Sequence, residues 1–535
     1  MTLAVSPFSN YDPISVPKMA VLATVAFAIL GICISSSFSE IVYESKTFSG
    51  LTFCFVLALL IPIFFSGSNL GQQFWGVFGR NTGFLTYFSL AIVMWAASNA
   101  TTNVFGKKLS KSLLITAAVT TIYCLIQIAG YDPIQWSLMD TFATLGNINF
   151  LSAFLGLSSI TSFAILLSHE FPVVWRITSL ILLTSGLPII WSTGSIQGLM
   201  MFILGFYIVT FFVIKSKFKS RLLYVLYLLV GVIGSILGLQ GLRNKGPLAS
   251  FLYQPSVTFR EDYMHAGWEM MILKPFVGVG LDSYGDWYRQ VRGQISTMRT
   301  DPERVSNSAH NIFLDLASGG GALVFLLYLS LYVYCFAKCL AHIRKTPTYD
   351  PVFVALFASW CAYILQAVIS INQIGVGVWG ALLLGALLSY TRLNKGDLSV
   401  NEKKLIRSRS HAKEMVLPAK VALVSYFFAS IGFFASFPPL KIDADFRKAS
   451  TPEQSMMVAK SRLASSFYKE MTLQRLLEQS RYQESKKMAQ EIVAGHPRSF
   501  YAWKMLTLIP GSTSAEVEEA RKELKKLDPF NPNVG

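Results

Sequence analysis

The sequence contains few charged residues for its length. Only 14% of its 535 residues are Asp, Glu, Lys or Arg, whereas a soluble protein has about a quarter. Hydrophobic residues make up 53%, and the mean hydropathy is +0.47. Many apolar runs reach or approach the roughly 20 residues that a helix needs to cross a bilayer. We therefore predict an all-α polytopic membrane protein.

Cysteine is also scarce, and its positions argue against both disulfide bonds and thiolate metal sites. Cys335 and Cys339 are four residues apart, which places them on one helical face, but no further ligand lies near them in sequence. A cleavable signal peptide is not expected either, because the run from Met19 to Ile34 has only Lys18 before it and no clear cleavage site after it. The six cysteines all lie in or beside apolar runs: Cys33, Cys54, Cys124, Cys335, Cys339 and Cys361.

The net charge of +16 has two possible meanings, nucleic-acid binding or membrane topology. The basic residues cluster in short connections between apolar runs, as the positive-inside rule expects. Nucleic acid is therefore not an expected partner. The clusters are Lys107, Lys108, Lys111; Lys215, Lys217, Lys219, Arg221; Lys338, Arg344, Lys345; and Arg392, Lys395, Lys403, Lys404, Arg407, Arg409, Lys413.

These clusters orient the predicted helices. The connections 100–110, 215–221, 338–345 and 392–413 are predicted to face inside. The segments 67–82, 131–147 and 242–310, the tail after 437 and, by counting, the N-terminus then face outside. The twelve predicted spans are about 18–36, 48–66, 83–99, 110–130, 148–168, 173–192, 196–214, 222–241, 311–337, 351–370, 373–391 and 416–436.

Two domains are predicted, a membrane domain over 1–436 and a helical tail over 437–535. The large outside loop of the membrane domain, 242–310, contains eight Lys/Arg and seven Asp/Glu interleaved with aromatic residues. That mixture suits carbohydrate or interfacial lipid binding, and it equally suits a small folded cap. In the tail, apolar residues recur at helical spacing, which suggests one or two tetratricopeptide-like units. Because one or two repeats bury little surface by themselves, we expect the tail to pack on the membrane domain or on a partner.

Four segments predicted to face outside carry candidate site residues. Asn147 and Asn149 enter a helix, where amides either cap the helix or bind hydroxyl groups. The segment 192–198, Ser-Thr-Gly-Ser-Ile-Gln-Gly, forms either a simple turn or a set of backbone N–H groups facing an anion.

The other two segments contain the charged candidates. Arg260 lies near the start of a predicted amphipathic helix that leads to Gly278-Val279-Gly280, and its planar guanidinium suits phosphate oxygens. An ion pair with a neighbouring carboxylate is the alternative. His310 opens the next apolar helix, and in this region only its side chain is expected to titrate near neutral pH. A structural, hydrogen-bonded histidine is the alternative there.

In order and spacing, these segments resemble the O-antigen ligase and polymerase superfamily, in its bacterial branch with a tetratricopeptide tail. The resemblance is carried by Gly-Asn-x-Asn at 146–149, by Arg260 to Trp268 leading to Gly-Val-Gly, and by the His-Asn pair at 310–311. Trp75-Gly76, followed by Arg80, is similar to a further segment of that branch. Many members have an arginine near 193–195, where this chain continues with Ile196 and Gln197.

The resemblance implies an architecture like that of GT-C glycosyltransferases. It also implies metal-independent transfer of a glycan from an undecaprenyl-pyrophosphate carrier to an acceptor hydroxyl, without a cofactor. A DxD pair in the outside loop and a His/Cys metal cluster are both missing from the sequence, which is consistent with this. The implied catalytic residues are His310 and Arg260. The implied substrate-binding residues are Asn311, Asn147, Asn149, Arg304, Arg289, Gln197 and Arg80.

The expected partners are a donor, which is a glycan linked to undecaprenyl pyrophosphate, and an acceptor, which is a glycan, a lipid or a protein. Membrane lipids are expected partners too, and the tail is a candidate site for a protein partner. The expected location is the bacterial inner membrane. Two other functional classes stay open. One is a lipid-linked glycan transporter or flippase, although the apolar runs contain few of the ionisable groups that transport pathways use. The other is a membrane scaffold whose tail recruits partners.

Overall fold

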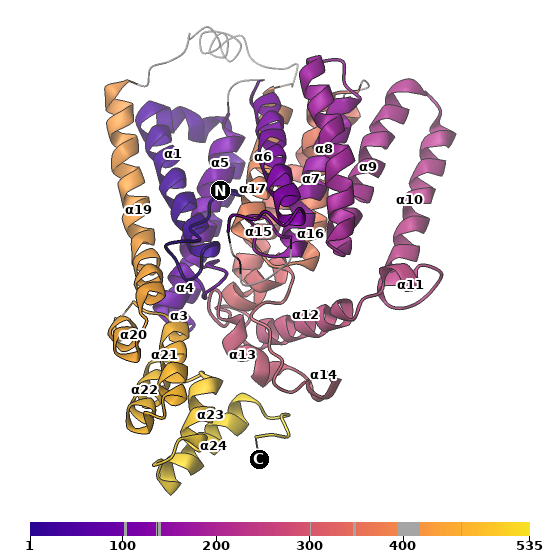
Figure 1. Ribbon diagram of the computed structural model, residues 1–535. Coiled ribbons are helices and arrows are strands. Elements are labelled where there is room, and N and C mark those ends of the chain that lie inside the picture. Colours follow the sequence, from indigo (N-terminus) through magenta and orange to yellow (C-terminus); the bar gives the residue numbers. More distant parts are fainter. Residues whose placement is uncertain are drawn as a thin grey trace.

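A computed structural model describes residues 1–100, 104–134, 136, 141–299, 301–345, 349–393, 418–461 and 463–534 (Figure 1). The described part of the chain is helical and contains no strand. Eleven of its helices are long and apolar enough to cross a membrane. The prediction of an all-α polytopic membrane protein is confirmed.

Each predicted span corresponds to an observed helix or helix pair. The helix of the third predicted span, α5, has only 15 residues, fewer than the roughly 20 that a helix needs to cross a bilayer. The membrane-domain helices are α1 (Ser15–Glu44), α2 (Lys46–Ala58) with α3 (Leu60–Phe65), α5 (Phe84–Ser98), α6 (Phe105–Ile128), α7 (Ile148–Leu166), α8 (Val173–Ser192), α9 (Ile196–Lys217), α10 (Arg221–Leu242), α15 (Ile312–Lys345), α16 (Pro351–Ile369), α17 (Ile374–Leu393) and α19 (Ala419–Lys448).

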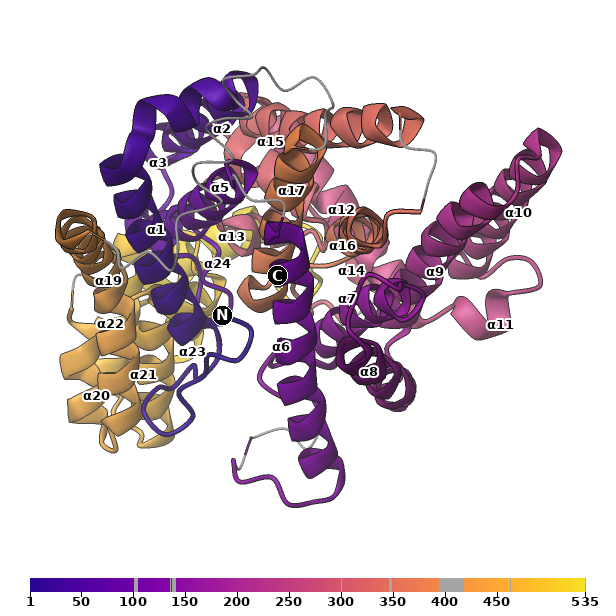
Figure 2. The same cartoon turned by 90° about the horizontal axis from the view of Figure 1, so that it is seen from above.

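The helices differ strongly in how much protein surrounds them. α16 and α17 are almost entirely buried, whereas α10 stands apart beside α9 (Figure 2). Its apolar side chains are largely exposed, and in a membrane protein such a surface faces lipid. α7 packs against α8, α9 and α16. The most buried helices, α7, α16 and α17, form the centre of the bundle.

The basic connections lie at one end of the helical bundle. The Lys215 ammonium donates to the Ile343 carbonyl at 2.7 Å, and the Arg392 guanidinium donates to the Ala100 carbonyl at 3.1 Å. The segment 338–345 is not a loop but the last turns of α15. The basic residues between 395 and 413 lie outside the described residues. Their side of the membrane stays a prediction.

At the opposite end, the segment 242–310 folds into short helices rather than an open loop (Figure 1). These are α11 (Ala249–Leu252), α12 (Pro255–Leu273), α13 (Tyr284–Val291) and α14 (Gln294–Arg299). Ala266, Met270, Tyr284 and Tyr288 form a small buried core with Ala309, which precedes α15. This is the folded cap that the sequence left as one of two possibilities.

The last membrane helix continues 12 residues past the predicted boundary at 436. α19 contains Pro438 and Pro439, and Pro439 has no N–H to bond the Ala435 carbonyl four residues earlier. The indole N–H of Trp75 donates to that carbonyl at 2.8 Å instead. Because this outside donor replaces the missing one, the helix runs from the membrane domain into the tail without a break.

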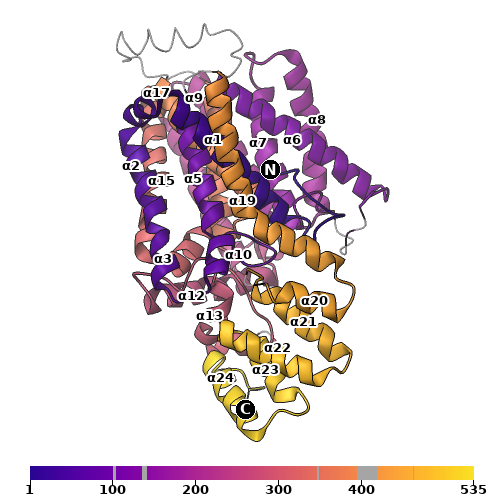
Figure 3. The same cartoon turned by 90° about the vertical axis from the view of Figure 1, so that its left-hand side faces the viewer.

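The tail is a row of short helices that packs below the bundle (Figure 3). Phe78 and Phe467 stack with ring centroids 3.7 Å apart. The Asp443 carboxylate accepts the N–H groups of Tyr11 and Asp12, which ties the N-terminal segment to the same end. The helices are α20 (Pro452–Ala459), α21 (Ser466–Glu478), α22 (Tyr482–Gly495), α23 (Phe500–Leu508) and α24 (Ser514–Leu527). Their likeness to tetratricopeptide repeats stays a prediction.

Candidate active site

His310 is held in an uncommon backbone conformation at the start of α15. Its φ is +54°, a region that costs a non-glycine residue of order 1–3 kcal/mol. The Ser308 hydroxyl accepts the His310 N–H at 3.0 Å and donates to the Asp315 carboxylate at 2.7 Å. Asp315 also accepts the Ala309 N–H at 2.7 Å. A carboxylate one turn into the helix thus fixes the loop that carries the histidine.

Two glycine-rich segments pack closely beneath this loop. The N–H groups of Val279 and Gly280 donate to the carbonyls of Ser318 and Gly319 at 2.8 and 3.0 Å. A Cβ added to Gly278 would lie 2.3 Å from the Gly319 oxygen, so only glycine allows this backbone contact. The contact fixes the end of α12 against α15, and with it the relation between Arg260 and His310.

Arg260 and Tyr263 occupy one face of α12, three residues apart. The Tyr263 ring lies against the His310 imidazole, with centroids 5.2 Å apart. Arg260 is half-buried, and it has no hydrogen-bond or ion-pair partner among the described residues. The predicted alternative, a local ion pair, is therefore not found: neighbouring Asp262 instead pairs with Arg299 at 3.2 Å.

Burial, and then the nearby cations of Arg260 and Arg80, lower the pKa of His310 to about 4. The imidazole is therefore neutral at pH 7 and able to accept a proton. Burial also lowers the pKa of the Arg260 guanidinium, although arginine stays charged near neutral pH. The site thus contains an unpaired cation beside a neutral base, an arrangement that attracts an anion.

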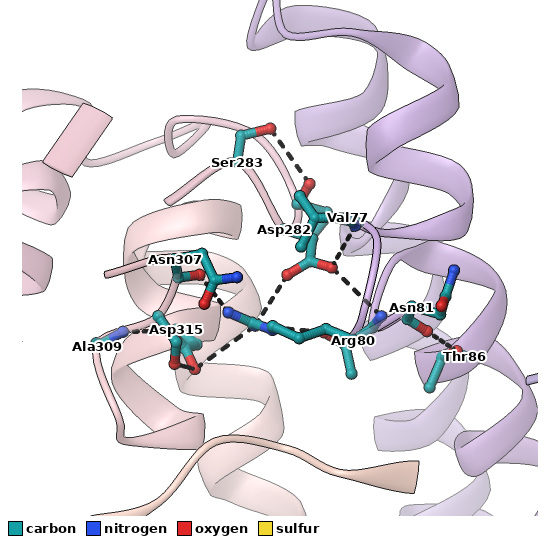
Figure 4. Close-up of polar contacts among 12 residues, drawn as sticks. Val77, Arg80, Asn81, Thr86, Asp282, Ser283, Asn307, Ala309 and Asp315 are labelled. Atoms are coloured by element: carbon teal, nitrogen blue, oxygen red, sulfur yellow. Dashed lines mark hydrogen bonds and ion pairs between the residues drawn. The ribbon is translucent and has the colours of Figure 1, made fainter. Parts of the chain in front are cut away.

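Arg80 lies near this pair but is already neutralised. Its guanidinium is buried 2.8 Å from the Asp282 carboxylate and 4.0 Å from Asp315, and it donates to the Asn307 carbonyl (Figure 4). Asp282 also accepts the Val77 N–H at 2.9 Å. Arg80 therefore joins the segment after α4 (Leu70–Trp75) to the cap and to α15. Its charge is neutralised by these carboxylates, and its part in substrate binding stays a prediction.

His310 lines a cavity of about 610 Å³, a size within the range of small-molecule sites. Tyr263, Asn307 and Arg289 from the cap also line it, and residues of α21 and α23 form the opposite wall. The cavity therefore lies between the cap and the tail.

The remaining predicted residues of this region have internal partners. Arg289 pairs with Glu303 at 3.2 Å and with Asp528 of the tail at 2.8 Å. The Arg304 guanidinium lies over the Phe259 ring, 4.6 Å from its centroid, and is otherwise exposed. The Asn311 side chain accepts the Leu314 N–H and so caps α15.

Asn147, Asn149 and Gln197 form a separate group where α7 and α9 begin. Asn147 caps α7 by accepting the Asn149 N–H, and Asn149 accepts the Ser195 hydroxyl at 2.8 Å. Gln197 is only 3% exposed, and neither its amide nitrogen nor its oxygen has a partner among the described residues. Gln254, which precedes α12, donates to the Gly194 carbonyl at 3.4 Å and links this group to the helix of Arg260.

Residues 179–329 match the family model described as O-Antigen ligase. The chain carries an O-antigen ligase domain. This match and the spanning helices identify it as a multi-pass membrane glycosyltransferase of the ligase and polymerase type in general terms. No curated protein matches the sequence.

The O-antigen ligase domain contains both members of the central pair, Arg260 and His310, and also Gln197. Arg80 and the two amides of α7 lie before it, and the tail lies after it. The cavity is therefore built from the ligase domain together with a segment that the family match does not cover.

Several important residues were not predicted from the sequence. Asp282 and Asp315 hold the loops of the site, and Arg292 and Asp528 form a buried pair, 2.7 Å apart, that fixes the tail. The sequence gives one signal for the last pair, since Asp528 lies in a turn-forming Asp-Pro segment that follows a helix. Which arginine it would meet depends on the tertiary structure.

Proposed function

We propose that this protein moves a glycan from an undecaprenyl-pyrophosphate carrier to an acceptor hydroxyl, in cell-surface polysaccharide assembly. The O-antigen ligase domain supports the reaction class. The observation that carries the assignment is the unpaired Arg260 cation beside the neutral imidazole of His310. Metal ions and organic cofactors have no part in the proposed reaction.

In the proposed reaction, Arg260 binds the diphosphate of the donor. The bond between the sugar's anomeric carbon and the diphosphate oxygen breaks, and the electron pair leaves with the diphosphate. A half-buried guanidinium stabilises that growing negative charge more strongly than an exposed one would, because less water screens it. No other ligand has to be displaced first, since Arg260 has no partner among the described residues.

His310 accepts the acceptor's hydroxyl proton as the new glycosidic bond forms. A base of this kind typically supplies about 10²–10⁴ in rate. When the diphosphate binds Arg260, its negative charge offsets the cations that lower the His310 pKa. The donor thus makes the imidazole more basic at the step that uses it.

The other residues take supporting roles in this proposal. Arg304, which is exposed, assists at the diphosphate, and Arg289 lines the cavity while holding the tail. Asn311, Asn147, Asn149 and Gln197 contact donor or acceptor oxygens, and Arg80 positions the loops. The cap and the tail face outside the inner membrane, and the basic connections face inside.

Replacing His310 by Ala, or Arg260 by Gln, tests these roles. We expect each change to reduce transfer at least 100-fold, because it removes the base or the cation that stabilises the leaving group. The measurement is glycan transfer in membranes that contain the lipid-linked donor, with protein amount and thermal unfolding measured in parallel.

His265→Ala and Arg299→Gln are matched controls. His265 is exposed on the same helix as Arg260, and Arg299 forms a partly exposed ion pair, which contributes about 0–1 kcal/mol. Both controls should keep normal transfer. Full activity in His310→Ala or Arg260→Gln would contradict the proposed function, as would export of donor without any transfer in the unsubstituted protein.

A further inference from the structure

The wall of the cavity that faces His310 comes from the tail. Tyr501 of α23 and Glu470 of α21 line it, opposite Tyr263 and Asn307 of the cap. The cavity is incomplete without this wall, because neither the cap nor the tail encloses it alone.

Buried contacts hold the tail wall in place against the cap. The Arg292 guanidinium and the Asp528 carboxylate are both almost fully buried and lie 2.7 Å apart. A second contact between tail and cap is made by Arg498, whose guanidinium lies 3.5 Å from the centroid of the Trp287 ring. Removing either partner of a buried ion pair would leave an uncompensated charge in the interior, so this pair keeps the wall a fixed part of the site.

The charged side chains that line the cavity each have an internal partner among the described residues, except His310. Glu303 accepts from both Arg289 and Lys504, at 3.2 and 3.1 Å. The His496 ring lies 3.1 Å from the Asp286 carboxylate, and Glu470 accepts the Ser499 hydroxyl at 2.6 Å. Asp286 and Glu303 are therefore compensated by neighbouring basic side chains, whereas Glu470 and Arg498 have uncharged hydrogen-bond partners. Arg260 does not line this cavity.

The uncharged polar groups are the ones left available. The hydroxyls of Tyr263 and Tyr501, the side-chain amide of Asn307 and the ring nitrogens of His310 have no hydrogen-bond partner among the described residues. They come from both walls of the same cavity. Hydroxyl and amide groups beside aromatic rings match a ligand that has many hydroxyls and apolar C–H faces.

We propose that the tail forms half of the acceptor subsite, which binds a neutral saccharide between Asn307 of the cap and Tyr501 of α23. The acceptor sugar then presents one hydroxyl to His310, while the donor diphosphate binds at Arg260. This inference rests on the proposed function and adds to it the class of acceptor. It also gives the tail a direct part in substrate binding.

Direct binding to the purified full-length protein tests the inference without any donor. Saturation-transfer NMR in a detergent that contains no sugar would use neutral trisaccharides ending in glucose, galactose or N-acetylglucosamine. Tyr501→Phe and Asn307→Ala should each weaken binding about twofold to tenfold, the usual range for one lost hydrogen bond. Tyr482→Phe is the matched control: this tyrosine is 40% exposed on α22 and does not line the cavity.

Tyr501→Phe keeps the ring that packs on the tail core, so it separates lost binding from lost folding. Equal binding by all four proteins would overturn the proposal. Failure of every trisaccharide to bind would overturn it too, and so would binding of only a serine-containing peptide or a phosphorylated sugar. Because this readout does not depend on transfer, failure of the transfer assay and failure of this inference can be told apart.

Discussion

Arg260, predicted to be catalytic, and Arg80, predicted to bind substrate, differ in their surroundings in the folded protein. Arg80 is buried against Asp282 and Asp315, which neutralise its charge, and these contacts hold three segments together. Arg260 is half-buried and has no such partner among the described residues. A buried cation beside a carboxylate is neutralised by that partner, whereas an unpaired one is available to an anionic ligand.

At the same scale, the low pKa of His310 leads to a prediction about pH. In the protein without donor, the pKa of His310, the proposed base, is lowered to about 4, first by burial and then by nearby cations. We therefore expect kcat/KM to stay level near neutral pH and to fall only as the pH approaches 4. In the donor complex the diphosphate offsets the Arg260 cation, so the pKa rises and the acid limb of kcat moves to higher pH. The measurement is transfer rate against pH at low and at saturating donor.

His265→Ala serves as the control for this pH profile, since His265 is exposed and away from the cavity. Acid limbs of kcat/KM and of kcat that coincide near 6.5, the ordinary value for histidine, would contradict the prediction. They would mean that neither burial nor the neighbouring cations act on the base.

At the scale of elements, α19 depends on a donor from another part of the chain. Trp75 supplies the N–H that Pro439 cannot give to the Ala435 carbonyl. The same helix then carries Asp443, which ties the N-terminal segment and accepts the Tyr468 hydroxyl at 2.7 Å. The junction between the membrane domain and the tail is therefore a continuous helix in which a tryptophan N–H replaces one missing backbone hydrogen bond.

We predict that Trp75→Phe lowers the free energy of unfolding by about 0.5–1.5 kcal/mol for the lost hydrogen bond, plus a smaller loss of packing. The effect should shrink in a Pro439→Ala background, because the alanine N–H can then bond the Ala435 carbonyl. Thermal unfolding of the four proteins in one detergent measures this coupling. Purely additive effects would show that the indole N–H does not replace the missing helical bond.

At the scale of the whole molecule, the two ends of the bundle have different chemistry. One end has the basic connections, such as Lys215 beside Ile343, and the other has the cap and the tail (Figure 1, Figure 3). The positive-inside rule predicts that the basic end faces the cytoplasm. A site facing outside would then meet a donor whose glycan has already crossed the membrane.

Cysteine labelling of spheroplasts with a membrane-impermeant maleimide checks this orientation. Lys245→Cys and Lys487→Cys, at exposed positions of the cap end and of the tail, should react in intact spheroplasts. Lys217→Cys, at the end of α9 that lies among the basic connections, should react only after the membrane is opened. The unsubstituted chain measures background from the native cysteines. The reverse pattern would place the candidate site in the cytoplasm and contradict the proposed location.

The site was only partly predictable. Local sequence indicated the helix that carries Arg260, the glycine turn after it and the capping of α7 by Asn147, because these depend on residues a few positions apart. It did not indicate that Arg80 meets Asp282, 202 positions later, or that Arg289 meets Asp528 of the tail. Such pairs depend on which segments the fold brings together.

The sequence by itself determined the helical, membrane-spanning character of this protein and the order of its spans, because long apolar runs have no other stable state in a bilayer. The tertiary structure alone decided which cations are free and which are paired, and that the tail forms one wall of the cavity beside His310. The physical reason is that pairing and enclosure depend on distances in space between distant segments, whereas helix formation and burial in lipid depend on neighbouring residues.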